Sequence, residues 1–107
     1  MYDILRILME NIKCDMRGLL SFLILWLLTK KSMHGEEIAK EIEKRRGNKP
    51  KTGTLYPALK YLRKKGLIKG EKKGKTIVYS LTKDGEKTIK DSVKYFSKTF
   101  KEILDSK

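Results

Sequence analysis

The residues of this 107-residue chain that could do chemistry are its basic ones, and they gather in one stretch. Residues 44–75 hold thirteen Lys and Arg and a single acid, Glu71, which gives this window a net charge of +12. The other 75 residues are nearly neutral, although the chain as a whole carries +13. Such a field attracts an anionic partner, which can be a nucleic acid, an acidic membrane face or an acidic protein. We therefore expect a functional electropositive face.

The composition argues against several other kinds of site. One Cys cannot form an internal disulfide framework, and one Cys with one His cannot fill a four-ligand zinc site within the chain. No nucleophile–base pair stands out, so we expect neither an enzyme nor a cofactor or metal site. Residues 70–76 resemble a phosphate-binding loop. However, three residues separate the two glycines where that motif needs four, and the segment lies between two predicted strands.

Three single residues have a functional and a structural interpretation. His34 could sense pH or contact nucleic acid, but a packed or capping role in a turn is favoured. Cys14 could form an intersubunit disulfide or sense oxidants, but an inert reduced thiol is favoured. Trp26 could stack on a planar effector, but packing in the core is favoured.

The longest apolar run covers residues 19–28. Its ten residues fall short of the ~18 that a membrane span needs. Acidic residues precede the run, and Lys30 and Lys31 follow it in place of a cleavage site for a signal peptide. We expect a helix buried in the core of a cytoplasmic protein.

Hydrophobic periodicity predicts the elements that position the basic residues. Helices are expected at 1–13, 19–29, 36–46, 52–65 and 82–106, a break at 15–18, a turn at 32–35, strands at 67–71 and 76–81, and a basic hairpin tip at 72–75. This order predicts a mainly α (α+β) winged helix-turn-helix with a two-stranded β wing and an extra N-terminal helix.

The fourth predicted helix should turn Leu55, Ala58, Leu59 and Leu62 inward, since they follow i, i+3, i+4, i+7 spacing. Pro57 restricts where this helix can begin, because proline has no N–H to donate. We favour Thr54 as the N-cap, which would place Pro57 in the first turn, with Thr52 as the alternative.

The last predicted helix carries an apolar seam. Its members are Ile89, Val93, Phe96, Phe100 and Ile103, spaced as in about two heptads. Thr82 is expected to cap this helix. A short helix with such a stripe needs a partner, which is its own core, the N-terminal helix or the same helix of a second chain.

Specific motifs resemble the PadR family of winged-helix transcriptional regulators. They are the apolar helix from Gly18 to Leu28, HGEEIA at 34–39, GTLYPALKYL at 53–62, GLI at 66–68, YSLT at 79–82 and Gly85. The likeness covers roughly residues 17–86. It departs from the family pattern at Glu36, where Tyr is usual, and in a second wing strand that lacks an Arg-rich approach to Tyr79. The C-terminal part is a single short helix, with little room for the larger effector domain of some members.

The resemblance implies a DNA-binding homodimer that represses transcription and has a C-terminal dimerisation helix. The chain would divide into an N-terminal amphipathic helix (1–14), a winged helix-turn-helix domain (15–82) and the dimerisation helix (83–107). The expected interface comprises Leu5, Leu8, Ile12, Ile89, Val93, Phe96, Phe100 and Ile103. A two-fold dimer places two recognition helices about 34 Å apart, so the operator should be an inverted repeat.

Helix-turn-helix proteins place the second helix in the major groove of double-stranded DNA. The predicted contacts are Lys51, Thr52, Thr54, Tyr56, Pro57, Lys60, Arg63 and Lys64 on the recognition helix (about 52–65) and Lys72, Lys73 and Lys75 on the wing (71–76). Thr54 and Lys60 suit base edges. Tyr56 is assigned to a phosphate, with packing as the alternative. The wing lysines would follow the flanking backbone or the minor groove.

Three other functions compete with a sequence-specific repressor. The first is a non-specific architectural DNA- or RNA-binding protein that uses the same positive face. The second is a sensor of a small hydrophobic effector, bound in an apolar dimer groove near Trp26, Phe96 and Phe100. The third is a membrane-surface protein. It is disfavoured because the basic residues do not lie on one amphipathic helix.

Overall fold

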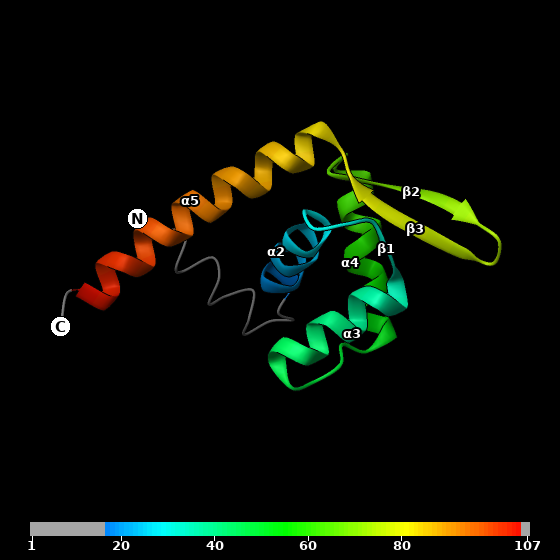
Figure 1. The fold of residues 1–107 in the computed structure, drawn as a ribbon, viewed down its shortest axis with the longest axis horizontal. Helices are drawn as coiled ribbons and strands as arrows, with labels where there is room; N and C mark the ends of the chain where they lie inside the picture. The colour runs from blue at the N-terminus through cyan, green and yellow to red at the C-terminus, as the bar shows by residue number, and fades with distance from the viewer. Residues whose placement is uncertain (1–16, 106–107) are drawn as a thin grey trace.

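The structure, a computed structural model, describes residues 17–105, which form four helices and a three-stranded sheet (Figure 1). The elements are α2 (Arg17–Leu28), β1 (Met33–His34), α3 (Gly35–Arg46), α4 (Thr52–Lys64), β2 (Ile68–Lys73), β3 (Thr76–Leu81) and α5 (Lys83–Asp105). This is the predicted helix-turn-helix followed by a β hairpin, so the predicted winged fold is confirmed. The predicted helix at 1–13, with Leu5, Leu8 and Ile12, lies outside the described residues, as does Cys14.

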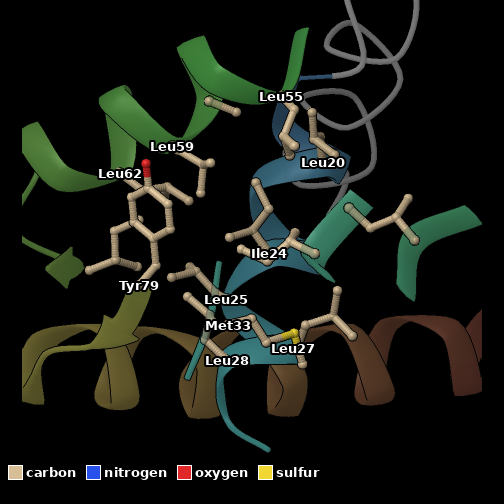
Figure 2. Packing of buried hydrophobic residues seen from close by; sticks show 14 of the residues in the cluster. Leu20, Ile24, Leu25, Leu27, Leu28, Met33, Leu55, Leu59, Leu62 and Tyr79 are labelled. Atoms are coloured by element: carbon tan, nitrogen blue, oxygen red, sulfur yellow. The ribbon is translucent and has the colours of Figure 1, made fainter. Parts of the chain in front are cut away.

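Helix α2 lies inside the core, as its apolar sequence predicted. The side chains of Leu20, Ile24 and Leu27 are at most 1% exposed. Figure 2 shows Leu20 beside Leu55 of α4, with α5 running past the other end of α2. The four residues of α4 predicted to face inward, Leu55, Ala58, Leu59 and Leu62, are all buried, so that prediction is confirmed. The exposed side of α4 is therefore fixed by the packing of the opposite side.

The sheet has the order β1–β3–β2, and both pairs of strands are antiparallel. The prediction of a turn at 32–35 is wrong, because Met33 and His34 pair with Tyr79 and Val78 of β3. No local pattern reveals this short strand. It forms because burial of Met33 brings the segment against a strand that follows more than 40 residues later.

The wing is longer than the sequence predicted. Strand β2 continues through Lys72 and Lys73, so these two residues are not in the hairpin tip. Lys73 pairs with Thr76, which leaves Gly74 and Lys75 as a two-residue loop. Gly74 has a φ of +63°, as the tight turns that join twisted strands require.

His34 caps helix α3, as the structural interpretation of this residue predicted. Its Nδ1 accepts a hydrogen bond from the backbone N–H of Glu37, and the Glu37 carboxylate accepts one from the backbone N–H of His34. This reciprocal pair satisfies two donors that the first turn of a helix leaves free. The backbone hydrogen bond from His34 also holds the pKa of Glu37 below its ordinary value.

Helix α4 begins earlier than we favoured. Its N-cap is Lys51, and the N–H groups of Thr54 and Leu55 both donate to the Lys51 carbonyl. Pro57 therefore lies inside the helix and cannot donate to the carbonyl of Gly53, four residues earlier. Gly53 is exposed, so water can hydrate that carbonyl and limit the cost.

Hydrogen bonds join the end of α4, the wing and the start of α5. Gly66, with a φ of +76°, ends α4, where Leu67 donates to the carbonyl of Leu62. The Thr82 hydroxyl accepts from the backbone N–H of Gly85 at 3.0 Å and donates to the Gly66 carbonyl at 2.6 Å. The prediction that Thr82 caps the last helix is confirmed.

We predict that Thr82→Val destabilises the fold by about 1–2 kcal/mol, because valine keeps the shape of threonine but removes both hydrogen bonds. Urea denaturation measures the change. Ser97→Ala, at an exposed position in the middle of α5, is the matched control and should have little effect. Equal stability of Thr82→Val and the natural protein would show that the cap contributes nothing.

Helix α5 has 23 residues and is therefore about 34 Å long. Ile89, near its start, is buried in the core. Phe96 packs on Phe22 of α2 with ring centroids 4.8 Å apart. Beyond this contact the helix extends away from the domain (Figure 1). No helix in the described part of the chain is long and apolar enough to cross a membrane.

Candidate nucleic-acid interface

The outermost stripe of α4 lies opposite its buried face. It consists of Gly53, Pro57, Lys60 and Lys64, all of which are exposed. The N-terminal half of the stripe is small and uncharged, whereas the C-terminal half carries two long cations. A partner can thus approach the backbone of α4 near Gly53, where the position of an added Cβ has open space around it.

Tyr56 both packs within the domain and faces solvent. Its ring covers Gly35, the first residue of α3, so closely that a Cβ on Gly35 would lie 2.6 Å from the Tyr56 hydroxyl oxygen. The side chain nevertheless remains 46% exposed. The structure therefore shows the packing role of Tyr56, and its contact with a phosphate stays a prediction.

The cations of the basic window fall into two groups. Three cations on and just after α3 have acidic partners: Lys44 and Arg45 contact Glu41 at 3.1 and 2.9 Å, and Lys49 contacts Glu36. The hydrogen bond from Lys49 also lowers the pKa of Glu36. By contrast, within the part of the chain that the structure describes, no carboxylate pairs with Lys51, Lys60, Lys64, Lys72 or Lys75. Within the basic window, these cations without a carboxylate partner thus lie along α4, at its N-cap and on the wing.

The two faces of the wing differ in chemistry. Paired residues of an antiparallel ladder share a face, so Gly70, Lys72, Ile77 and Tyr79 lie on one side. The other side carries Lys73 and Glu71, which form an exposed ion pair at 3.6 Å. The only acid of the basic window therefore lies on the face that points away from Tyr79.

Arg63 connects α4 to the wing, a contact that sequence reasoning missed. Its guanidinium lies over Gly70, where an added Cβ would be 3.3 Å from Cζ. Burial raises the pKa of the Tyr79 hydroxyl, and the nearby charge of Arg63 opposes part of this rise. Only the glycine at position 70 could have pointed to a close approach on this face.

The predicted interface residues of α5 are in different environments. Ile89 is buried within the protomer, whereas Val93 and Phe100 are 39% and 45% exposed. Phe100 stacks on Phe96 at 5.6 Å. Ile103 lies further along the same helix and is 42% exposed. The seam thus begins in the core and emerges at the surface.

Trp26 lies in an open groove of about 530 Å³ between α2 and α5, lined also by Ile89 and Val93. Two cations, Lys30 and Arg45, lie over its ring at 4.5 and 4.9 Å. Phe96 and Phe100 do not line this groove. The predicted effector site, a groove between two copies of the chain, therefore stays a prediction.

Known proteins with this architecture are transcriptional regulators. Residues 24–91 match the model of the transcriptional regulator PadR-like family. A transcriptional regulator from Clostridium thermocellum is 31% identical, with 83% of this chain and 90% of that chain covered and a TM-score of 0.74. RosR from H. salinarum is 29% identical, with coverages of 76% and 74% and a TM-score of 0.71.

A PadR-like transcription factor from Bacteroides fragilis, at 24% identity, shares the fold with a TM-score of 0.78 over 91% of this chain and 99% of that chain. No match was found among curated proteins. The family model covers well over half of the chain, and its members are transcriptional regulators rather than enzymes. The chain therefore belongs to the PadR-like family of transcriptional regulators.

Proposed function

We propose that this DNA-binding transcriptional regulator is a sequence-specific repressor that binds an inverted-repeat operator as a homodimer. Each protomer would place α4 in the major groove and the wing on the flanking backbone. The observation that carries the proposal is the group of uncompensated cations on the outer face of α4 and on the wing, next to α3 cations that have acidic partners.

Each predicted contact has a role in this arrangement. Thr54 and Lys60 would reach base edges, and the small residues Gly53 and Pro57 let the start of α4 enter the groove closely. Lys51, Thr52, Tyr56, Arg63 and Lys64 would contact phosphates, and Lys72, Lys73 and Lys75 would contact the flanking backbone. Lys73 would exchange its exposed pair with Glu71 for a phosphate.

The dimer would form through α5. Val93 and Phe100 expose apolar side chains on this helix, and a second copy of the same helix would supply a matching stripe. The division into segments 1–14, 15–82 and 83–107, the cytoplasmic location and a small hydrophobic effector near Trp26 remain predictions.

Fluorescence anisotropy tests the function most directly. The protein is titrated, near ~150 mM salt, into the duplex upstream of its own gene and into a scrambled duplex of equal composition. A preference of about a thousandfold or more supports a sequence-specific regulator of its own gene. If both duplexes bind equally, selection from random DNA follows. Failure to enrich any sequence there would instead favour the non-specific architectural function.

We predict a steep dependence of operator affinity on salt. With six to ten phosphate contacts, the affinity should fall by roughly 10³–10⁵-fold between 50 and 200 mM salt, because each contact releases condensed counterions. Anisotropy at four or five salt concentrations gives the slope. A slope near zero would contradict binding through the cations of α4 and the wing.

A further inference from the structure

The proposed docking mode has a geometric consequence for the DNA. If α4 occupies the major groove and the wing reaches the adjacent minor groove, one sugar–phosphate strand separates the two grooves. That strand must cross between the C-terminal half of α4 and one face of the wing. This face carries Gly70, Lys72, Ile77 and Tyr79. The side chains at this junction therefore determine whether both elements can bind at once.

The junction contains an anchored cation. Arg63 comes from the last turn of α4, and its guanidinium lies over the backbone of Gly70 in β2. An added Cβ at Gly70 would be 3.4 Å from Nε of Arg63 and 2.9 Å from Cγ2 of Ile77. The absence of a side chain at Gly70 thus makes room for both neighbours. Tyr79 pairs with Gly70 in the ladder and is only 5% exposed.

The junction also contains an apolar surface in an otherwise cationic region. Ile77 is 38% exposed on the wing, directly opposite Lys72 in the ladder. Ile77 does not belong to the buried core cluster of the domain. A deoxyribose ring, which is the apolar part of a DNA strand, suits such a surface, while the phosphates on either side suit Arg63 and Lys72.

We propose that Arg63, Lys72 and Ile77 form a seat for the single DNA strand that separates the two grooves, with a phosphate on Arg63 and its deoxyribose against Ile77. The guanidinium already lies over Gly70 before DNA arrives, so less side-chain freedom is lost on binding. This inference rests on the proposed function and specifies how helix and wing act together. Because the seat contacts only the sugar–phosphate backbone and no base edge, it adds affinity without adding sequence preference.

Single neutral phosphates test the seat. Once an operator is identified, each phosphate of one half-site is replaced in turn by an uncharged methylphosphonate, and affinities are measured for the natural protein, Arg63→Gln and Lys65→Gln. Lys65→Gln is the matched control, because it removes one charge two residues away and Lys65 lies over the Tyr61 ring instead of the wing. We expect Arg63→Gln to lower affinity about tenfold or more for the operator and for scrambled DNA alike.

The decisive result is whether the affinity lost by neutralising one phosphate differs between the natural protein and Arg63→Gln. One methylphosphonate position per half-site should weaken the natural protein and Lys65→Gln about tenfold or more but leave Arg63→Gln nearly unchanged, because the partner charge is already absent. Additive losses at every position would overturn the proposal. Thermal melting of each variant shows whether the fold is kept. Gly70→Ala provides a second approach, because it should displace Arg63 without removing its charge and should reduce the affinity lost at the same phosphate.

The apolar part of the seat has its own test. Ile77→Ser should lower affinity roughly fivefold on any duplex, whereas Ile77→Val, which keeps the apolar surface, should bind nearly as the natural protein does. Equal affinities for both variants would remove Ile77 from the seat. If the natural protein binds its operator specifically but none of these variants changes the binding, this inference fails alone. If the natural protein prefers no sequence, the proposed function itself fails.

Discussion

Phe100→Asp is expected to convert the protein to a monomer and to lower its affinity for a two-half-site operator by about 10²–10⁴-fold, down to the affinity of a single half-site. The loss is large because two linked recognition helices bind the second half-site at a high effective concentration. No contact with DNA is changed by the substitution.

The reason lies in the position of Phe100 on α5. Its ring stacks on Phe96 and remains 45% exposed, at the point where the apolar seam emerges from the core. In a two-fold dimer one substitution places two carboxylates in the same apolar interface. Each carboxylate would lose its hydration without gaining a partner, which costs several kcal/mol.

Sedimentation and anisotropy with full and half operators measure this effect. Lys101→Glu is the control, because it adds a carboxylate to an exposed position of α5 away from the seam and removes a positive charge as well. It should keep the dimer and most of the affinity. If the natural protein sediments as a monomer at concentrations that saturate the operator, dimerisation through α5 is wrong.

Gly85→Ala is expected to destabilise the fold by about 3 kcal/mol and to lower the melting temperature by roughly 10 °C or more. Gly85 lies in the first turn of α5, where an added Cβ would be 1.9 Å from the carbonyl oxygen of Leu67 and 3.1 Å from Leu81. The same carbonyl accepts a hydrogen bond from Thr82, so it cannot move away without breaking that bond.

Gly53→Ala makes the same chemical change, but we expect it to raise the stability of the fold instead of lowering it. Gly53 is inside α4, and no atom lies within 4 Å of the position that its Cβ would occupy. Alanine favours helix more than glycine does, so stability should rise by about 0.5–1 kcal/mol. Circular dichroism melts of the two variants, measured side by side, check both signs. A stable Gly85→Ala protein would show that the start of α5 can shift to accept a side chain.

Local patterns predicted the parts of the fold that depend on nearby residues. The buried face of α4 follows from the spacing of Leu55 to Leu62, and the cap at Thr82 follows from a hydroxyl before a helical segment. The N-cap of α4 was misplaced because Pro57 was expected to avoid the helix interior. The exposed position of Gly53 makes the loss of that bond tolerable, and exposure cannot be read from residue type alone.

Features that depend on contacts between distant segments could not be predicted in the same way. Strand β1 exists only because Met33 meets β3, and Arg63 can lie against the wing only because Gly70 has no side chain there. The charge count identified the basic window correctly. However, it could not show that Glu36 and Glu41 compensate the α3 part of that window, since this depends on the fold.

The lysines of β2 have a consequence besides the DNA contact proposed for them. In the order β1–β3–β2, strand β2 is an edge strand of six residues, and its free backbone groups could pair with a strand of another molecule. Lys69, Lys72 and Lys73 place charge along that edge, and lysines on edge strands are a known protection against such pairing. Wing variants made neutral to abolish DNA binding would therefore also lose protection against aggregation, and charge reversal to Glu is the better substitution.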